Sequence, residues 1–437
     1  MRPPCVLPLL GFHRLDGNAP TAAPTSLVVV TGSELVRGDR ADRNGPFLAR
    51  ELVRLGLEPA RIAIVGDDER ELEAALSEGL RADLCVVSGG LGPTHDDRTV
   101  EFVARTAGVE LRVDPALESE IERISRAIAD RLKRPYADFE AGVRKQATIP
   151  HGAISLGLAG TAPGLVLQTS RAVVVILPGP PEELQRLWPL ALETEPVRRV
   201  SARATPPERR VLRFFGASES EVARALADAG GEPKGVQATV CARDFEIHVD
   251  LFGPSEPLAD ALRERLARHL FSEDERPIEE IVLQLCREDG LTLATAESLT
   301  GGMVATRLTS VPGSSDVFVG GIVAYSNELK ERELGVAGDV LRIHGAVSAE
   351  AAAAMATGAR GRLGADVAVS VTGIAGPSGG SPAKPVGLVY VHGETPDSSR
   401  GVEFTFGRDR ESIRRRATAT ALHLVRRLLT RSRGQDA

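Results

Sequence analysis

Residues 296–302, with the sequence AESLTGG, combine a serine, a threonine and two glycines directly after an apolar run at 291–294. This context predicts that Ser298 lies on a turn between a strand and a helix, with Thr300, Gly301 and Gly302 opening the helix. Such a turn exposes a side chain and points free backbone N–H groups at its target. One loop can therefore supply a nucleophile and oxyanion donors. The alternative interpretation is an ordinary N-terminal helix cap.

A second segment, residues 320–327 (GGIVAYSN), is typical of a buried strand that ends at Tyr325 and Ser326, with Asn327 capping the next helix. Lys330 then falls in the first helical turn, where a cation opposes the helix dipole. The positive end of the helix dipole should lower the pKa of a lysine held there, and a general base requires such a lowered pKa. A solvated lysine is the alternative.

A third apolar strand, at residues 368–371, continues into the glycine-rich stretch 372–380, which contains Thr372, Gly373 and Gly376. So many glycines weaken a core element but suit a backbone that approaches a ligand closely. Three strand ends with small, polar or ionisable residues predict one crevice at the carboxyl edge of a sheet.

These motifs together resemble the C-terminal domain of the competence/damage-inducible protein A (CinA) family. The segments that carry the resemblance are ESLTGG, GGIVAYSNELK, HGAVS (344–348) and SVTGIAGPSGG followed by KPVG (384–387), within a domain expected at 277–432. The resemblance implies a nicotinamide mononucleotide deamidase, an amidohydrolase that releases ammonia and nicotinate mononucleotide. It also implies that Ser298 is the nucleophile and that Tyr325 and Lys330 activate it.

This assignment is chemically coherent, because an unactivated carboxamide needs a nucleophile stronger than neutral water, and serine activated through lysine and tyrosine can perform acyl transfer. Backbone N–H groups at Thr300–Gly302 or at Thr372–Gly373 are expected to hold the oxyanion, the substrate phosphate or both. Gly376 is expected in the same site, and no cofactor is expected for the deamidase. Arg410 is a candidate phosphate ligand, although Gly407 and Arg408 stand where the family has Pro-Gly before Asp-Arg. A basic helix face continuing through 414–416 is the alternative for Arg410.

The N-terminal half carries a separate candidate site. An apolar strand at 84–88 runs directly into Gly89-Gly90-Leu91-Gly92-Pro93-Thr94, and a helical pattern follows. Strand, glycine-rich turn and helix start form a phosphate cradle, since free N–H groups converge there. The adjacent aspartates could cap the helix or hold a divalent cation beside the phosphate. The predicted site comprises Ser88, Gly89, Gly90, Gly92, Thr94, Asp96, Asp97, Lys145, Pro178 and Gly179.

The run SGGLGPTHDD (88–97) resembles the molybdopterin-binding domain of molybdenum-cofactor proteins (MoaB/Mog type), and more closely the version found in the CinA family. For residues 26–200 this resemblance implies ADP-ribose pyrophosphatase activity with a divalent metal such as magnesium, for which Asp97 is a candidate ligand. Val143 stands where the family has an asparagine, which makes this activity less secure than the deamidase. Pterin binding is the alternative.

Between the two main domains, a basic proline-containing linker at 202–210 precedes a small α/β unit expected at 208–273. Strands are expected at 212–215 and 245–252, with helices at 218–229 and 258–270. The unit resembles the KH-type subdomain of the family, which suggests a spacer or dimerisation element. The Gly230–Gly235 segment matches only loosely the GXXG loop with which KH domains bind nucleic acid. The aromatic residues on which bases would stack are also missing, so nucleic acid is not expected as a partner.

Composition agrees with a multidomain α/β protein: two three-layer α/β/α domains with mostly parallel sheets, joined by the KH-like subdomain. The 437-residue chain exceeds one ordinary core. Four well-separated cysteines indicate free thiols in a reducing cytoplasm. No apolar stretch approaches the ~18 residues of a membrane span. Residues 1–25 fit no domain and are expected to be a disordered extension.

Two classes of function therefore compete. The first is an enzyme of pyridine-nucleotide salvage, acting on nicotinamide mononucleotide and on ADP-ribose. The second is an interaction protein for competence or recombination in which both sites are idle. The joint presence of Ser298, Tyr325 and Lys330 favours the enzyme, since a scaffold has no need of all three. A homodimer is expected from the resemblance alone.

Overall fold

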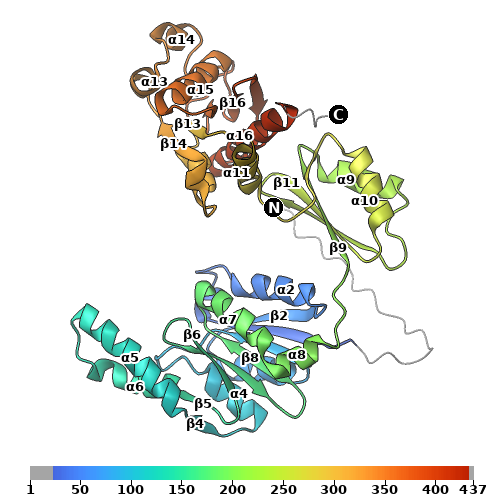
Figure 1. The fold of residues 1–437 in the computed structure, drawn as a ribbon, viewed down its shortest axis with the longest axis vertical. Helices are drawn as coiled ribbons and strands as arrows, with labels where there is room; N and C mark the ends of the chain where they lie inside the picture. The colour runs from blue at the N-terminus through green and yellow to red at the C-terminus, as the bar shows by residue number, and fades with distance from the viewer. Residues whose placement is uncertain (1–22, 433–437) are drawn as a thin grey trace. The chain divides into compact units, whose positions relative to one another are not determined.

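A computed structural model describes residues 23–432, which divide into two compact units at Pro207 and Glu208 (Figure 1). Most of the extension expected at residues 1–25 lies outside the described part. The expected fold class is confirmed, since both units are α/β. Three of the five strand pairings in the large sheet of the first unit are parallel, as are two of the four in the large sheet of the second unit. No described helix combines the length and the apolar character needed to cross a membrane.

The first unit is built on a six-stranded sheet of order β2-β1-β3-β8-β7-β6, in which β7 and β6 are antiparallel to their neighbours. A short β4–β5 ladder lies apart from it. The strands are β1 (Ser26–Thr31), β2 (Pro59–Val65), β3 (Leu84–Ser88), β4 (Leu111–Val113), β5 (Thr148–Pro150), β6 (Ile154–Leu158), β7 (Pro163–Gln168) and β8 (Val173–Leu177). The helices are α1 (Ser33–Val36), α2 (Asn44–Arg54), α3 (Glu69–Gly79), α4 (Thr99–Ala107), α5 (Pro115–Leu132), α6 (Ala137–Gln146), α7 (Pro181–Glu193) and α8 (Glu195–Ser201).

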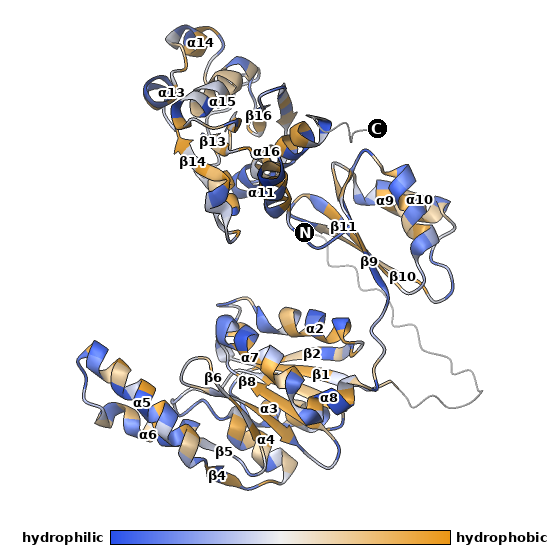
Figure 2. Ribbon diagram, viewed as in Figure 1, coloured by the Kyte–Doolittle hydropathy of each residue, from blue (hydrophilic) through white to orange (hydrophobic). Residues whose placement is uncertain are grey.

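Helices cover both faces of this sheet, because its central strands are apolar on both sides. Val29 and Val87 pack with α3, α4, α5 and α6, whereas Val28 and Val86 pack with α2, α7 and α8. The strands of this sheet are coloured largely as hydrophobic in Figure 2. The unit is therefore a three-layer sandwich.

The second unit begins with the small α/β subdomain, a four-stranded antiparallel sheet of order β10-β11-β9-β12 packed against two helices. Its elements are β9 (Arg209–Phe215), α9 (Glu219–Asp228), β10 (Gln237–Arg243), β11 (Glu246–Phe252), α10 (Glu256–Arg265) and β12 (Leu270–Ser272). Helix α9 starts with a capping box between Ser218 and Glu221. Strands β10 and β12 were not expected from the sequence.

The rest of the second unit is a five-stranded sheet of order β14-β13-β15-β16-β17 with parallel β14, β13 and β15. The strands are β13 (Leu293–Glu297), β14 (Phe318–Val323), β15 (Val367–Gly373), β16 (Leu388–Glu394) and β17 (Ser399–Thr405). The helices are α11 (Ile278–Glu288), α12 (Met303–Thr309), a 3-10 turn (Ser314–Asp316), α13 (Asn327–Leu334), α14 (Gly338–Ile343), α15 (Ala349–Leu363) and α16 (Arg410–Ser432).

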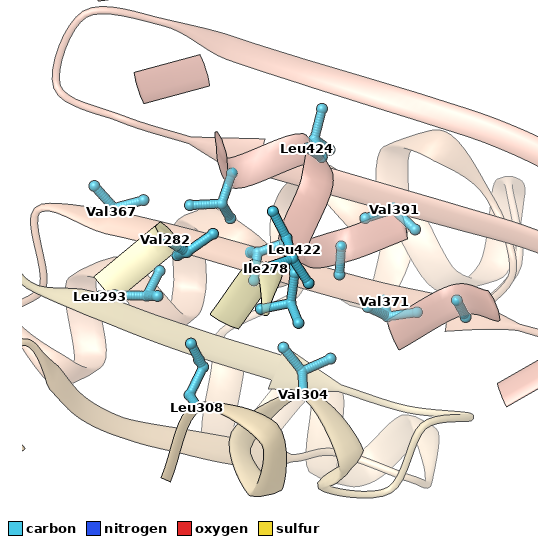
Figure 3. Close-up of a cluster of buried hydrophobic side chains, with 14 of the residues drawn as sticks. Ile278, Val282, Leu293, Val304, Leu308, Val367, Val371, Val391, Leu422 and Leu424 are labelled. Atoms are coloured by element: carbon cyan, nitrogen blue, oxygen red, sulfur yellow. The ribbon is translucent and has the colours of Figure 1, made fainter. Parts of the chain in front are cut away.

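Two hydrophobic cores hold this sheet between its helices. On one face, Val371 and Val391 pack with Val282 of α11, Val304 of α12 and Leu422 of α16 (Figure 3). On the other face, the core contains residues of β13, α13, α14 and α15. The carboxyl ends of β13, β14 and β15 are thereby fixed side by side.

One expectation about this sheet is wrong. The segment around Gly320 was expected to be a buried strand, but β14 is the edge strand, and its residues alternate between partly buried and exposed. An edge strand has one neighbour only, so its short apolar run cannot be enclosed on every side.

Within the second unit, β11 contacts α16 through a buried polar pair. The Nε2 atom of His423 lies 2.8 Å from a carboxylate oxygen of Glu246, and the His423 ring stacks on Phe215 at 3.7 Å between centroids. Burial lowers the pKa of His423 to about 4, against the pull of Glu246. Burial would raise the pKa of Glu246, but hydrogen bonds with His248 and His423 lower it to about 2.

We expect acid to weaken this contact. Because the folded pKa values of His423 and Glu246 lie below their ordinary values of 6.5 and 4.5, the unfolded state binds more protons, and stability falls as pH falls from about 6.5. Hydrogen exchange in α16 of the full chain, compared at pH 7 and pH 5 after correction for intrinsic rates, should show the loss. His423→Gln keeps a hydrogen-bond donor for Glu246 but does not titrate, so the difference in exchange rate between pH 7 and pH 5 should become smaller. An equally large difference in the variant would contradict this account.

Candidate functional site

Ser298 follows the last residue of β13 and is nearly buried, with 8% of its surface exposed. Its backbone N–H donates to the carbonyl of Val371 on β15, which anchors the turn to the sheet. The Nζ atom of Lys330 lies 3.2 Å from the Oγ atom of Ser298. The structure thus brings together Ser298, predicted on a strand-to-helix turn, and Lys330, predicted in the first turn of another helix.

Lys330 occupies the first turn of α13 and is only 1% exposed. Its Nζ also contacts the carbonyl oxygens of Ala324 at 2.8 Å and Tyr325 at 3.5 Å. No carboxylate within residues 23–432 forms an ion pair with it. Burial lowers the pKa of the Lys330 ammonium, which favours the neutral amine that a general base requires.

Glu297 directly precedes the nucleophile candidate, and its buried carboxylate occupies the start of α12. It accepts hydrogen bonds from the backbone N–H groups of Gly302 (3.0 Å), Val304 (3.1 Å) and Ala305 (2.9 Å). The chain therefore satisfies this helix N-terminus itself, which leaves it closed to an external anion. No role was predicted for Glu297 from its sequence context.

The expected oxyanion donors are only partly free. The N–H of Gly302 goes to Glu297, and the N–H of Gly301 donates to the carbonyl of Ser298. In the described part of the chain, the N–H groups of Leu299 and Thr300 have no acceptor, and both residues are buried. Of the three residues expected to supply donors, Gly301 and Gly302 therefore have their N–H groups paired within the chain.

In the second expected loop, too, one backbone N–H group is paired and another is not: that of Thr372 is bonded to the neighbouring strand, and that of Gly373 is not. Ile374 donates to Leu388 at 2.9 Å, so the pair Thr372–Tyr390 is hydrogen-bonded and the pair Gly373–Val389 is not. The N–H of Gly373 therefore points away from β16, toward the side of β15 on which β13 and Ser298 lie. The Thr372 hydroxyl donates to the carbonyl of Ala346.

Tyr325 and Arg410 form the outer part of the site. The Nη2 atom of Arg410 donates to the Tyr325 hydroxyl at 2.9 Å, and its Nη1 atom donates to the carbonyl of Gly376 at 2.7 Å. Tyr325 is 59% exposed, and its hydroxyl forms this bond rather than one to Ser298 or Lys330. Tyr325 is thus an exposed side chain held by Arg410 rather than by the serine–lysine pair.

Arg414, one turn after Arg410 on α16, reaches the serine loop. Its Nε donates to the carbonyl of Leu299 at 3.0 Å and its Nη2 to the carbonyl of Thr300 at 2.9 Å. From the sequence, Arg414 was expected only as part of a basic helix face. The i, i+4 spacing from Arg410 is a signal that could have placed both on one side of the helix.

The separate site of the first unit lies at the carboxyl end of β3. The glycines at 89 and 90 have φ values of 104° and 66°, and a Cβ at Gly90 would lie 2.2 Å from the Thr99 hydroxyl. This backbone is open only to glycine. Within the described residues, the N–H groups of Gly90, Leu91 and Gly92 have no acceptor, as a phosphate cradle requires.

A cavity of about 800 Å³ opens beside this turn. Asn44 lines it and is oriented by donating to the Ser88 hydroxyl and the carbonyl of Gly179. Carboxylates from several loops also reach it: Glu34, Asp42, Asp67, Asp96, Asp97 and Glu183. Of the predicted residues, the cavity is lined by Gly89, Gly90, Gly92, Asp96, Asp97, Pro178 and Gly179, whereas Ser88 lies behind it.

Asp97, Thr94 and Lys145 make contacts with one another's segments that were not predicted from the sequence. Asp97 accepts from the Thr94 N–H and hydroxyl, which closes a turn, and α4 begins only at Thr99. Lys145 donates to the carbonyl of Thr94 and lines a neighbouring cavity of about 240 Å³. No three His, Cys, Asp or Glu side chains among residues 23–432 converge as a metal site would require. Val143 packs in the core, so its difference from the family pattern lies away from the cavity.

Fold and sites define a multidomain α/β protein with a buried serine–lysine pair on one sheet and a glycine-turn cavity on another. Residues 275–429 match the CinA C-terminal domain, and residues 27–196 match the probable molybdopterin binding domain. The chain is 44% identical over 423 residues to a CinA-like protein of Mycobacterium tuberculosis, covering 92% of this chain and 97% of the relative. The corresponding protein of Mycolicibacterium vanbaalenii is 43% identical over 416 residues, with 92% and 98% covered. The chain belongs to the CinA family.

Solved structures resemble parts of the chain. The competence/damage-inducible protein CihA of Agrobacterium tumefaciens is 41% identical, with 37% of this chain and 99% of that chain covered and a TM-score of 0.34. A CinA protein of Thermoplasma acidophilum, described as of unknown function, is 34% identical, with 40% and 98% covered and a TM-score of 0.35.

Glu297→Gln should destabilise the second unit. The amide keeps one acceptor oxygen, but its NH2 group then faces a backbone N–H, and a buried donor left unsatisfied costs about 1–3 kcal/mol. Urea unfolding followed by a probe in α12 measures the change. Glu264→Gln makes the same charge change at an exposed position and should leave the midpoint unaltered; equal midpoints for both variants would rule out the capping role.

Proposed function

We propose that the second unit is a serine amidohydrolase that deamidates nicotinamide mononucleotide. The observation that carries the proposal is the contact between Ser298 and a buried Lys330, which forms no ion pair with any carboxylate in the described part of the chain. The motifs shared with the CinA C-terminal domain support the choice of substrate. No group other than the residues of this site is needed for the chemistry.

The reaction begins when the Oγ atom of Ser298 attacks the carboxamide carbon while the neutral Lys330 amine takes the hydroxyl proton. A bond from Oγ to carbon forms, and the carbonyl oxygen becomes an oxyanion. The lysine ammonium then protonates the amide nitrogen, the carbon–nitrogen bond breaks, and ammonia leaves. Water, deprotonated by the same amine, hydrolyses the ester and restores Ser298.

The proposed oxyanion donors are the N–H groups of Leu299, Thr300 and Gly373, because within residues 23–432 the N–H groups of Ser298, Gly301 and Gly302 are already paired. Preorganised donors stabilise the charge that develops in the transition state. Arg410 and the Tyr325 hydroxyl lie farther out and are proposed to contact the nucleotide part of the substrate. On binding, a phosphate would replace one of the present partners of Arg410.

Ser298→Ala should abolish ammonia release from nicotinamide mononucleotide, because it removes the nucleophile without opening a large cavity. Purified wild type and variant are compared with no added metal, and thermal unfolding of the two should nearly coincide. Substantial residual turnover by the variant would exclude Ser298 as the nucleophile.

The rate of wild-type acylation should rise with pH and reach a plateau above the lowered pKa of Lys330, since only the neutral amine accepts the proton. Lys330→Ala should reduce kcat by about 10²–10⁴-fold, the range of general base catalysis, and remove this rise. Single-turnover rates across pH measure both effects. A variant that retained the wild-type profile would exclude the base role.

A second activity, metal-dependent cleavage of ADP-ribose at its pyrophosphate, is proposed for the first unit. The cavity of about 800 Å³ beside free N–H groups favours a diphosphate, and its acidic wall favours a cation that offsets the repulsion. The residues fit a magnesium ion held by one or two carboxylates and the ligand phosphates, rather than a cage made by the protein alone.

Asp97 tests this second activity. Asp97→Asn keeps an acceptor for Thr94 and should still raise the magnesium concentration needed for ADP-ribose cleavage, while ammonia release by the second unit stays unchanged. AMP formation from ADP-ribose, followed by chromatography over a magnesium titration, measures it. An unaltered magnesium dependence would restrict Asp97 to closing its turn.

A further inference from the structure

The geometry points to Arg414 as the positioning residue of the oxyanion hole, an inference that rests on the proposed amidohydrolase. Within residues 23–432, the hydrogen bonds of the Arg414 guanidinium go to two carbonyl groups of the serine loop and to Glu411, and none goes to Ser298 or Lys330. Arg414 therefore acts on the loop backbone and not on the serine–lysine pair.

The contacts fix two consecutive peptide groups. In a trans peptide the C=O and N–H point in opposite directions, so holding the carbonyl of Leu299 also sets the direction of the Thr300 N–H. Holding the carbonyl of Thr300 sets the Gly301 N–H, which closes the turn onto the carbonyl of Ser298. Because the Ser298 carbonyl and the Leu299 N–H belong to one peptide group, this bond also sets the direction of the Leu299 N–H.

The guanidinium group also changes the strength of these donors. A hydrogen bond from a cation to a carbonyl is stronger than a neutral one, and it polarises the peptide so that the opposite N–H becomes a better donor. The planar fork of an arginine suits two neighbouring carbonyls, whereas a lysine ammonium is a single point of contact. Arg414 thus both orients and polarises the Thr300 N–H.

The loop needs such a clamp, because its glycines give it no rigidity of its own. Gly301 and Gly302 have φ values of 59° and 97°, where glycine is favoured, and Gly301 is exposed. Glu297 holds the loop from the α12 side, and Arg414 holds it from the α16 side. The Leu299–Thr300 peptide between them is therefore held in one orientation.

Arg414→Ala should lower kcat by about 10- to 100-fold, somewhat less than the loss of a whole oxyanion donor, with little change in KM. Arg414→Lys should recover only part of this loss. The matched control is Arg415→Ala, the next residue on the same helix, whose partner is Asp244 of the small subdomain; its kcat should equal that of wild type. Guanidinium ion at non-denaturing concentration should partly restore Arg414→Ala but not Ser298→Ala.

A readout independent of the substrate is the rate at which a fluorophosphonate probe labels Ser298, followed by intact mass in the full chain. The tetrahedral adduct places an oxygen in the oxyanion hole, so Arg414→Ala should label more slowly than wild type and Arg415→Ala. The pH dependence of labelling should keep its midpoint, because Lys330 is untouched.

The outcomes separate this inference from the proposed function. No ammonia from the wild type with normal labelling would refute the deamidase, while slower labelling of Arg414→Ala would still support the clamp. Equal kcat and labelling rates for wild type and Arg414→Ala would overturn the clamp. A fall in thermal stability and a rise in KM, without rescue by guanidinium, would reduce Arg414 to a packing role, and a wild type that neither turns over nor labels would overturn both proposals.

Discussion

The buried amine of Lys330 is the constraint on which the second unit depends. Removing a lysine from water without a carboxylate partner disfavours its charged form and so opposes the folded state at neutral pH. The cost is tolerated because the surrounding elements are rigid: the two cores fix the ends of β13, β14 and β15, and α13 carries Lys330 back over them. The same burial that disfavours the charged lysine favours the neutral amine that the proposed base role beside Ser298 requires, so the energetic cost and the proposed reactivity have one cause.

Charges around this lysine are kept apart by backbone contacts. Glu297 is adjacent in sequence to Ser298, yet its carboxylate is directed into the start of α12 and engaged by three N–H groups. If it instead faced Lys330, the pair would hold the lysine charged and would end its use as a base. Arg414 similarly directs its guanidinium toward carbonyl groups of the loop and not toward the Lys330 ammonium.

Much of this arrangement could be predicted from the sequence. Apolar runs followed by Ser298, Tyr325 and Thr372 were enough to place three strand ends at one sheet edge, and the motif resemblance supplied the family. The contacts that refine the site could not be predicted, because they depend on tertiary directions. Whether an exposed tyrosine points to Ser298 or to Arg410 depends on the turn before α13, and whether β14 is central or an edge depends on strand order. The α12 start was misjudged because no local pattern shows that Glu297 faces inward.

The two glycine-rich turns of the chain illustrate the same limit. In both, an apolar strand runs into paired glycines before a helix, Gly89-Gly90 after β3 and Gly301-Gly302 after β13, and sequence alone predicts an anion site at each. In the first unit the turn leaves its N–H groups free beside a cavity of about 800 Å³. In the second, Glu297 fills the helix N-terminus, and only the peptide groups nearest Ser298 remain available. A turn with its donors open suits a bound phosphate. A turn closed by its own carboxylate leaves the few remaining donors beside Ser298, where they suit the proposed oxyanion, so the same sequence motif fits two different proposed chemistries.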